Sequence, residues 1–199
     1  MKKQITLLTL LIFTLCTQAI PWPIPDSGQT DSFTDTYGED SDYNINPRSY
    51  TKLDENGNDL PDSASSWAMV RDNVTCLVWE VKTDDGSIHD KDNKYNWHDA
   101  ETIFIKGLND QQFGSVSDWR MPTIKELASI VDLGTNEPSI DTRFFPGTMS
   151  SLSAFYWSST SGADLTGVAW GVHFRSGYGH DDAKDSSYFV RAVRGGQCR

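Results

Sequence analysis

Residues 118–127 of the chain read Asp-Trp-Arg-Met-Pro-Thr-Ile-Lys-Glu-Leu, and they mark the start of a helix. Pro122 precedes Thr123, and Glu126 follows three residues later, which is the spacing of a capping box. The Thr123 side chain is expected to accept a hydrogen bond from the Glu126 amide, while the Glu126 carboxylate accepts one from the Thr123 amide. Apolar residues then recur on one face, which predicts a buried side; they are Ile124, Leu127, Ala128, Ile130 and Val131.

A second helix is predicted upstream of this stretch. Apolar residues recur there at spacings of three and four, and the pattern frays near residues 107–109. The residues of the expected buried stripe are Trp97, Ala100, Ile103, Phe104 and Leu108.

The rest of the chain favours strands. β-branched and aromatic runs predict strands at residues 75–81 and 156–160. Residues 168–175 alternate between two sets, which predicts a half-buried strand with Val168, Trp170, Val172 and Phe174 on one face. Its partner is predicted to be residues 188–193, across a loop at 177–185 that is rich in Gly and Asp. A strand, two helices and then several strands predict an α+β fold with a mainly antiparallel sheet.

The N-terminus has the pattern of a signal peptide over residues 1–19. Lys2 and Lys3 precede an apolar run, and a small-x-small cleavage site ends at Ala19. A lipoprotein signal using Cys16 is the alternative, although no small residue directly precedes that cysteine. Residues 20–49 are acidic, contain prolines and lack a hydrophobic period, so they are expected to form a linker or a loosely attached strand. A folded domain is expected at residues 50–199, and no later stretch is apolar enough to span a membrane.

The charge is negative and uneven. The full chain has a formal net charge of −11, and removal of the two lysines in the signal peptide would make it −13. Residues 26–62 hold ten acids and two bases, whereas residues 63–199 hold eighteen acids and thirteen bases. An acidic chain is a poor match for nucleic acid or another polyanion unless it carries a local basic patch. Aromatic residues make up 12% of the chain, which suits a carbohydrate or partner surface as well as a core.

Two cysteines remain after signal removal, Cys76 and Cys198. Because exported proteins keep disulfides, the two are expected to pair, with two unpaired thiols as the alternative. A disulfide that closes so long a loop stabilises a fold by about 4 to 5 kcal/mol in chain-entropy models. Neither cysteine has a Cys or His neighbour at the spacing of a zinc site.

The stretch at residues 118–127 resembles the DWRLPT-x-x-EL signature of the C-terminal domain of Legionella collagen-like adhesins. Further segments match the family in the same order; they are residues 75–80, 97–100, 156–160 and 190–196. The resemblance covers roughly residues 50–198. The chain departs from the family at Cys76, where a Gly is usual, and at Met69, near which a cysteine would be expected.

The family is also similar to C-type-lectin-like folds, which include formylglycine-generating enzymes. That similarity implies two helices flanking an irregular antiparallel sheet, with the termini close together and long loops on one side. It is compatible with a bond between Cys76 and Cys198.

The signature residues are expected to be structural first. Trp119 and Trp157 are expected in the core, Pro122, Thr123 and Glu126 at a helix start, and Gly195 and Gly196 at a turn. Arg120, Arg191 and Arg194 are expected to pair with Asp118, Glu126 or Asp132. The alternative makes the arginines a ligand-binding anion site; its members would be Arg120, Arg175, Arg191 and Arg194.

Calcium is the candidate cofactor. Alternating oxygen ligands at Asp90, Asp92 and Asn93 suit a hard cation, and so do residues 54–59 and, more weakly, the loop at 177–185. Neither of the first two segments matches an EF-hand, and a solvated turn is the alternative reading of each. The four histidines lack zinc-protease spacing, and the chain has no G-x-S-x-G elbow or phosphate-binding glycine loop.

These patterns favour an exported, non-enzymatic binding module, located in the periplasm, on the outer surface or outside the cell. The expected partner is a glycan or a protein rather than nucleic acid, and self-association is left open. An envelope protein that docks through its N-terminal arm is the alternative, and a hydrolase or oxidase on the same fold is the third hypothesis.

Overall fold

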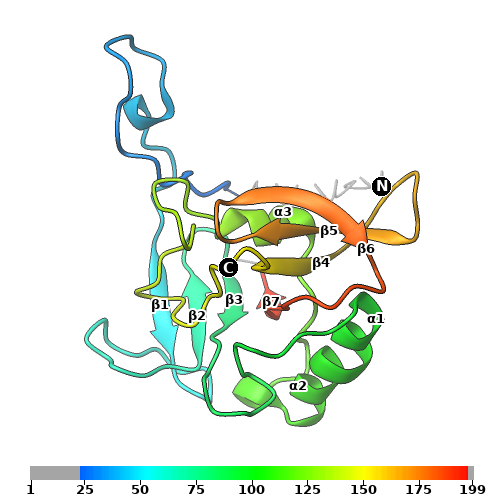
Figure 1. Cartoon of the computed structure of the whole chain (residues 1–199). Coiled ribbons are helices and arrows are strands. Elements are labelled where there is room, and N and C mark those ends of the chain that lie inside the picture. The colour runs from blue at the N-terminus through cyan, green and yellow to red at the C-terminus, as the bar shows by residue number, and fades with distance from the viewer. Residues whose placement is uncertain (1–22, 197–199) are drawn as a thin grey trace, which may run out of the picture.

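The computed structural model describes residues 23–196 and contains two antiparallel sheets with helices packed against them (Figure 1). The strands are β1 Tyr50–Leu53, β2 Met69–Asp72, β3 Leu77–Glu80, β4 Phe155–Ser161, β5 Val168–His173, β6 Tyr178–Ala183 and β7 Val193–Gly195. The helical segments are α1 Trp97–Asp99, a π-helix Ala100–Ile105, α2 Lys106–Asp110, α3 Ile124–Ser129, and two 3₁₀ turns at Asp40–Asp42 and Phe113–Ser115. No helix among these residues is long and apolar enough to cross a membrane.

The first sheet has the order β1-β2-β3-β7, with all neighbours antiparallel. Residue 50, where the folded domain was expected to begin, starts β1, and the C-terminal strand β7 pairs with β3 through Trp79 and Val193. The two ends of the domain therefore lie in one sheet. The α+β class and the antiparallel pairing predicted from the sequence are confirmed.

The second sheet has the order β4-β5-β6, which corrects one predicted pairing. The partner of β5 is not residues 188–193 but β6, within the stretch that was interpreted as a loop. The sequence did not indicate this strand because it contains Gly179, Asp181 and Asp182, and Gly and Asp are rare in strands. An edge strand tolerates such residues, since its exposed charges discourage pairing with another chain.

The two alternating sets of residues along β5 face opposite sides as predicted, but the strand is not half-buried. Ala169 is buried in one hydrophobic cluster and Val172 in the other, so the strand is covered on both faces. Trp170, which was expected to face the core, is 38% exposed. Coverage from two sides removes the period-2 contrast on which the interpretation depended.

The helix predicted from Trp97 onward forms, but its middle is a π-helix, Ala100–Ile105. The wider turn changes which residues face inward, because its hydrogen bonds span one residue more than in an α-helix. Ile105 is buried in place of Ile103, which is 56% exposed.

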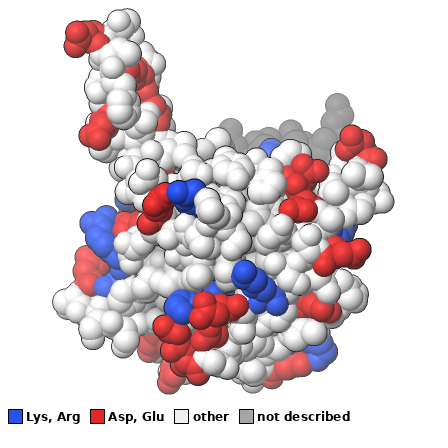
Figure 2. All heavy atoms as spheres, in the orientation of Figure 1, with Lys and Arg blue, Asp and Glu red and all other residues white. Residues whose placement is uncertain are grey.

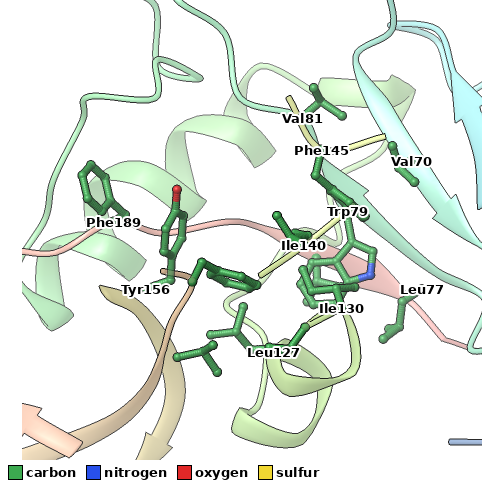
Figure 3. Packing of buried hydrophobic residues seen from close by; sticks show 14 of the residues in the cluster. Val70, Leu77, Trp79, Val81, Leu127, Ile130, Ile140, Phe145, Tyr156 and Phe189 are labelled. Carbon is green, nitrogen blue, oxygen red and sulfur yellow. The ribbon is translucent and has the colours of Figure 1, made fainter. Parts of the chain in front are cut away.

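The core has two hydrophobic clusters, and the neighbouring residues Met69 and Val70 of β2 belong to different ones. In the first, Leu127 and Ile130 from the α3 segment point toward Trp79 of β3 (Figure 3). Trp119 and Trp157 belong to the second cluster and are 2% and 0% exposed, as expected for core aromatics.

The segment before β1 is attached to the domain at its base and projects beyond it (Figure 1). Arg48 donates to the carbonyls of Asp26, Ser27 and Val131, and the Leu133 amide donates to the Ser27 carbonyl. The projecting lobe, residues 31–45, carries acidic side chains and no Lys or Arg, and its acids are visible in Figure 2. The segment that was expected to be a linker is therefore an arm whose base is held on the domain by the hydrogen bonds of Arg48 and Leu133. The predicted signal peptide, residues 1–19, lies outside the described residues.

Candidate functional site

The helix start at Thr123 frames the site. Thr123 and Glu126 form the predicted capping box, with the Glu126 amide donating to the Thr123 hydroxyl at 3.3 Å. Glu126 also takes two hydrogen bonds of 2.7 Å from the Arg120 guanidinium. Burial alone would raise the pKa of Glu126, but the hydrogen bonds from Arg120 and Thr123 outweigh burial and lower that pKa. The pair is therefore ionised and fixed in orientation.

The helical run from residue 97 to residue 110 forms the opposite wall. One face of this run turns toward Arg120 and Glu126; its residues are Trp97, Glu101, Thr102, Ile105, Lys106 and Asn109. Asn109 fixes the two walls together, because its side chain donates to the Trp119 carbonyl and accepts from the Trp119 amide, both at 2.9 Å.

Between the two walls lies an open cleft of about 860 Å³. Its floor is apolar and nearly inaccessible, formed by Ile105, Trp119 and Met121. Its rim is polar and exposed, and Ser159 of β4 completes it. An apolar floor with a few polar groups around it is the usual construction of a small-ligand site.

The charges around the cleft are largely paired. Lys106 bonds to Asp110 one turn along the helix, and Arg120 bonds to Glu126. Glu101 is exposed, and its side chain has no hydrogen-bond or ion-pair partner within residues 23–196. The cleft therefore presents one uncompensated carboxylate beside two neutralised cations.

The four arginines proposed as an anion site are not gathered into one. Arg194 pairs with Asp118 at 2.6 Å and Arg175 with Glu137 at 2.6 Å, while Arg120 is held by Glu126. Arg191 is fully buried and cannot contact a surface ligand. Its predicted place in an anion site is therefore wrong. The predicted ion pairs Arg120–Glu126 and Arg194–Asp118 are confirmed, whereas Arg191 pairs with none of the expected acids.

The loop proposed for calcium brings Asp90 and Asp92 together with Asp84, with ligand oxygens within 4.8 Å of one another. The Lys91 ammonium lies against two of these carboxylates, at 3.0 Å from Asp84 and 2.8 Å from Asp92. Asp90 accepts from the amides of residues 85, 86 and 92. The carboxylates of this cluster therefore already have partners, which are the Lys91 ammonium and three backbone amides.

The other proposed cation ligands have local structural partners. Asn93 uses its amide nitrogen on the carbonyls of Ser87 and Ile88. Asp54 accepts from the amides of Asn56 and Asn58, which closes a turn. Most of the loop predicted at 177–185 is strand β6.

A buried charge network at the end of β3 was missed from the sequence. Glu80 is completely buried and accepts from Lys82 at 3.0 Å, from His89 at 2.9 Å and from the Ala192 amide at 3.1 Å. Arg191 donates to the Glu80 carbonyl at 2.7 Å. Burial is opposed by the charges of these neighbours, and the net effect lowers the pKa of Glu80. Burial lowers the pKa of Lys82.

This network could not be read from spacing alone, because its members come from distant parts of the chain. The Glu at the end of the segment 75–80 and the Arg in the segment 190–196 were the available signals, since both lie in segments that match the family.

Cys76 has a backbone conformation that favours glycine, with φ of 57°. Its carbonyl accepts from the Gly196 amide at 3.1 Å, and Gly195 approaches the same carbonyl closely. Gly195 and Gly196 have positive φ values, and the predicted close approach of the backbone is confirmed; the predicted turn is instead the end of strand β7, in which Gly195 pairs with Leu77. Cys198 lies outside the described residues, so its pairing with Cys76 stays a prediction, supported by the position of Gly196 two residues before it.

Comparison with known proteins agrees with the resemblance seen in the motifs. No curated protein sequence matches the chain. The model of the Lcl C-terminal domain matches residues 68–194, which is more than half of the chain and spans both sheets except β1 and the last residue of β7. Three of the segments that carry the resemblance, at 97–100, 118–127 and 156–160, contribute side chains to the cleft. The chain belongs to the Lcl C-terminal domain family.

Proposed function

We propose that the protein is an exported, non-enzymatic binding module that recognises a glycan in the cleft between the 97–110 helical run and Arg120–Glu126. The cleft itself carries this proposal. Its frame is rigid, because Asn109 is bonded to the Trp119 backbone and Arg120 to Glu126. Glu101 and Thr102 stay exposed on the rim. A preformed site of this kind reduces the cost of ordering on binding.

The proposal that the module does not catalyse a reaction is supported by the role of the buried network. The hydrogen bond between His89 and Glu80 resembles that between a catalytic histidine base and the carboxylate that orients it. However, Glu80 also accepts hydrogen bonds from Lys82 and from the Ala192 amide. The His89 ring lies 4.3 Å from the Phe113 ring, tilted by 44°, and its Nδ1 is taken by Glu80. We interpret the network as structural.

The fold is proposed to be C-type-lectin-like, as the family resemblance implies, but ligand binding is proposed to be independent of calcium. The supporting contact is the Lys91 ammonium, which pairs with Asp84 and Asp92 where a calcium ion would bind. Adding calcium would require this ammonium to be displaced.

The proposal is tested by filling the cleft. Thr102 lines it and is exposed, so Thr102→Trp should block the cleft at little cost in stability. Ile103→Trp is the matched control, because Ile103 is the next residue on the same π-helix, is 56% exposed and does not line the cleft.

Both variants and the natural chain are compared on an array of neutral, acidic and sulfated glycans, with calcium and with chelator. Loss of glycan binding in Thr102→Trp alone supports the proposal. Binding that survives Thr102→Trp, or no binding by the folded natural chain, contradicts it.

A second candidate function is docking through the projecting arm. It is favoured by the exposure of large apolar side chains on an acidic lobe, with Phe33 at 74% and Tyr37 at 75%. Replacing residues 31–43 by a short Gly-Ser link should then abolish association with a partner of the cell envelope while leaving glycan binding intact.

A further inference from the structure

We infer that the cleft takes an uncharged, hydroxyl-rich saccharide, and that Glu101 is the principal acceptor for its hydroxyl groups. This inference rests on the proposed function and narrows its ligand to one chemical class. It depends on which hydrogen-bonding groups of the cleft are already used and which remain.

The cations of the cleft already have carboxylate partners, so their charges are compensated in the free protein although each keeps further N–H donors. Arg120 spends two of its donors on Glu126 at 2.7 Å each, in a bidentate pair. Lys106 is paired with Asp110. A polyanion would meet three carboxylates, Glu101, Asp110 and Glu126, against two cations, so like charge disfavours it relative to an uncharged ligand.

The hydroxyl groups of the rim donate internally and keep their acceptor oxygens. Thr102 donates to the His98 carbonyl at 3.0 Å, and Ser159 donates to the Pro122 carbonyl at 3.2 Å. Each hydroxyl has one proton but two lone pairs, so both oxygens can still accept. Together with the carboxylate of Glu101, these oxygens give the rim acceptors that have no donor in the free protein, beside the remaining N–H donors of Arg120 and Lys106.

A saccharide supplies such donors. Its neighbouring hydroxyls can both donate to one carboxylate, which has two oxygens and accepts only. Its C–H faces can pack against the apolar floor made by Ile105 and Met121. A sulfated or carboxylated chain brings more acceptors instead, and it would leave Glu101 unpaired in the bound state.

Titration calorimetry with defined probes tests the inference. The probes are neutral hexose and N-acetylhexosamine oligosaccharides and a heparin-derived oligosaccharide of equal length. At least one neutral probe should bind, and its affinity should change less than about twofold between 0.05 and 0.5 M salt, because screening acts on charge pairs.

Glu101→Gln should weaken neutral-saccharide binding about tenfold or more, because a charge-assisted hydrogen bond is replaced by a neutral one. Glu55→Gln is the matched control, since Glu55 is an exposed Glu without a hydrogen-bond or ion-pair partner in the described chain and lies outside the cleft. It should bind as the natural chain does.

The outcomes separate the inference from the proposed function. If the heparin probe binds more tightly, weakens with salt and is blocked by Thr102→Trp, the cleft is a glycan site but the inference is wrong. If Thr102→Trp abolishes neutral binding and Glu101→Gln leaves it unchanged, the role of Glu101 is wrong. If no saccharide binds to the folded chain, the proposed function fails and the inference with it.

Discussion

Replacing Glu80 by Gln should strongly destabilise the domain. The side chain keeps its size, so the change removes the charge and converts one acceptor into a donor. All three partners of this carboxylate, Lys82, His89 and the Ala192 amide, lie on it as donors. The new amide group would face at least one of them donor to donor, and the Lys82 ammonium would stay buried without its counterion.

The size of the effect follows from burial. The side chains of Glu80 and Lys82 are 0% and 4% exposed, so solvent cannot replace the lost partner. Removing one member of a buried ion pair costs about 3 to 5 kcal/mol. For a domain of this size, the corresponding drop in Tm is roughly 10 to 15 °C.

Urea unfolding followed by tryptophan fluorescence at pH 7 measures the change, and thermal unfolding checks it. Glu55→Gln is the control, because an exposed Glu without a partner should contribute within about 0.5 kcal/mol. A loss of less than 1 kcal/mol in Glu80→Gln, within reach of a surface change, would refute the structural role of the network.

The pH dependence gives a second readout. Burial would raise the pKa of Glu80, but Lys82 and His89 hold it below the ordinary 4.5. A carboxyl with a lowered folded pKa stabilises the fold fully above its unfolded pKa and loses that contribution as the pH falls through its folded pKa. The stability gap between the natural chain and Glu80→Gln should therefore be largest near pH 7 and close below pH 4.5. A gap that widens on acidification would contradict the assignment.

The remaining predictions concern Cys76 and the acidic loop. Under reducing conditions Cys76→Gly should be more stable than the natural chain by about 1 kcal/mol in urea unfolding, because glycine tolerates the positive φ at this position. In oxidising buffer the order should reverse, because Cys76 is predicted to pair with Cys198; the same order in both buffers would count against the disulfide. Calcium at 5 mM, about the weakest range of protein calcium sites, should leave Tm unchanged within about 1 °C while Lys91 pairs with the loop carboxylates. A rise of several degrees would show that the loop binds the ion.

Local signals predicted the helix start well. The capping box at Thr123 and Glu126 depends on residues three apart, so its geometry follows from the sequence directly. Trp119 and Trp157 were placed in the core for a similar reason, because large aromatic side chains are costly to leave exposed.

The failures came from features that only tertiary structure decides. Strand β6 is polar because it lies at a sheet edge, and its identity as a strand comes from pairing with β5. Ile103 faces outward because this helix has π-type hydrogen bonds. The spacing of apolar residues in the sequence does not predict a π-helix. Lys82, which follows the strand predicted at residues 75–81, is a core residue through its contact with Glu80 and its position 4.3 Å from the centre of the Phe104 ring.

The candidate site was visible in part. Arg120 and Glu126 were singled out, but the residue that distinguishes the ligand class, Glu101, was not. In the sequence, Glu101 lies on the polar face of a predicted helix, which indicates only a solvated surface. The structure places this face opposite Arg120 and Glu126, across the cleft. The structure also changes the interpretation of the four arginines that were candidates for an anion site. Each of them already binds an acceptor within the fold.

Whether a glycan binds in the cleft is measured by amide chemical-shift mapping during titration with a neutral oligosaccharide. We predict that the largest shifts occur at Glu101, Thr102, Lys106 and Ser159, and that they vanish in Thr102→Trp but persist in Ile103→Trp. Shifts confined to the loop at 84–92 or to the arm at 31–45, with the cleft unperturbed, would contradict glycan binding in the cleft.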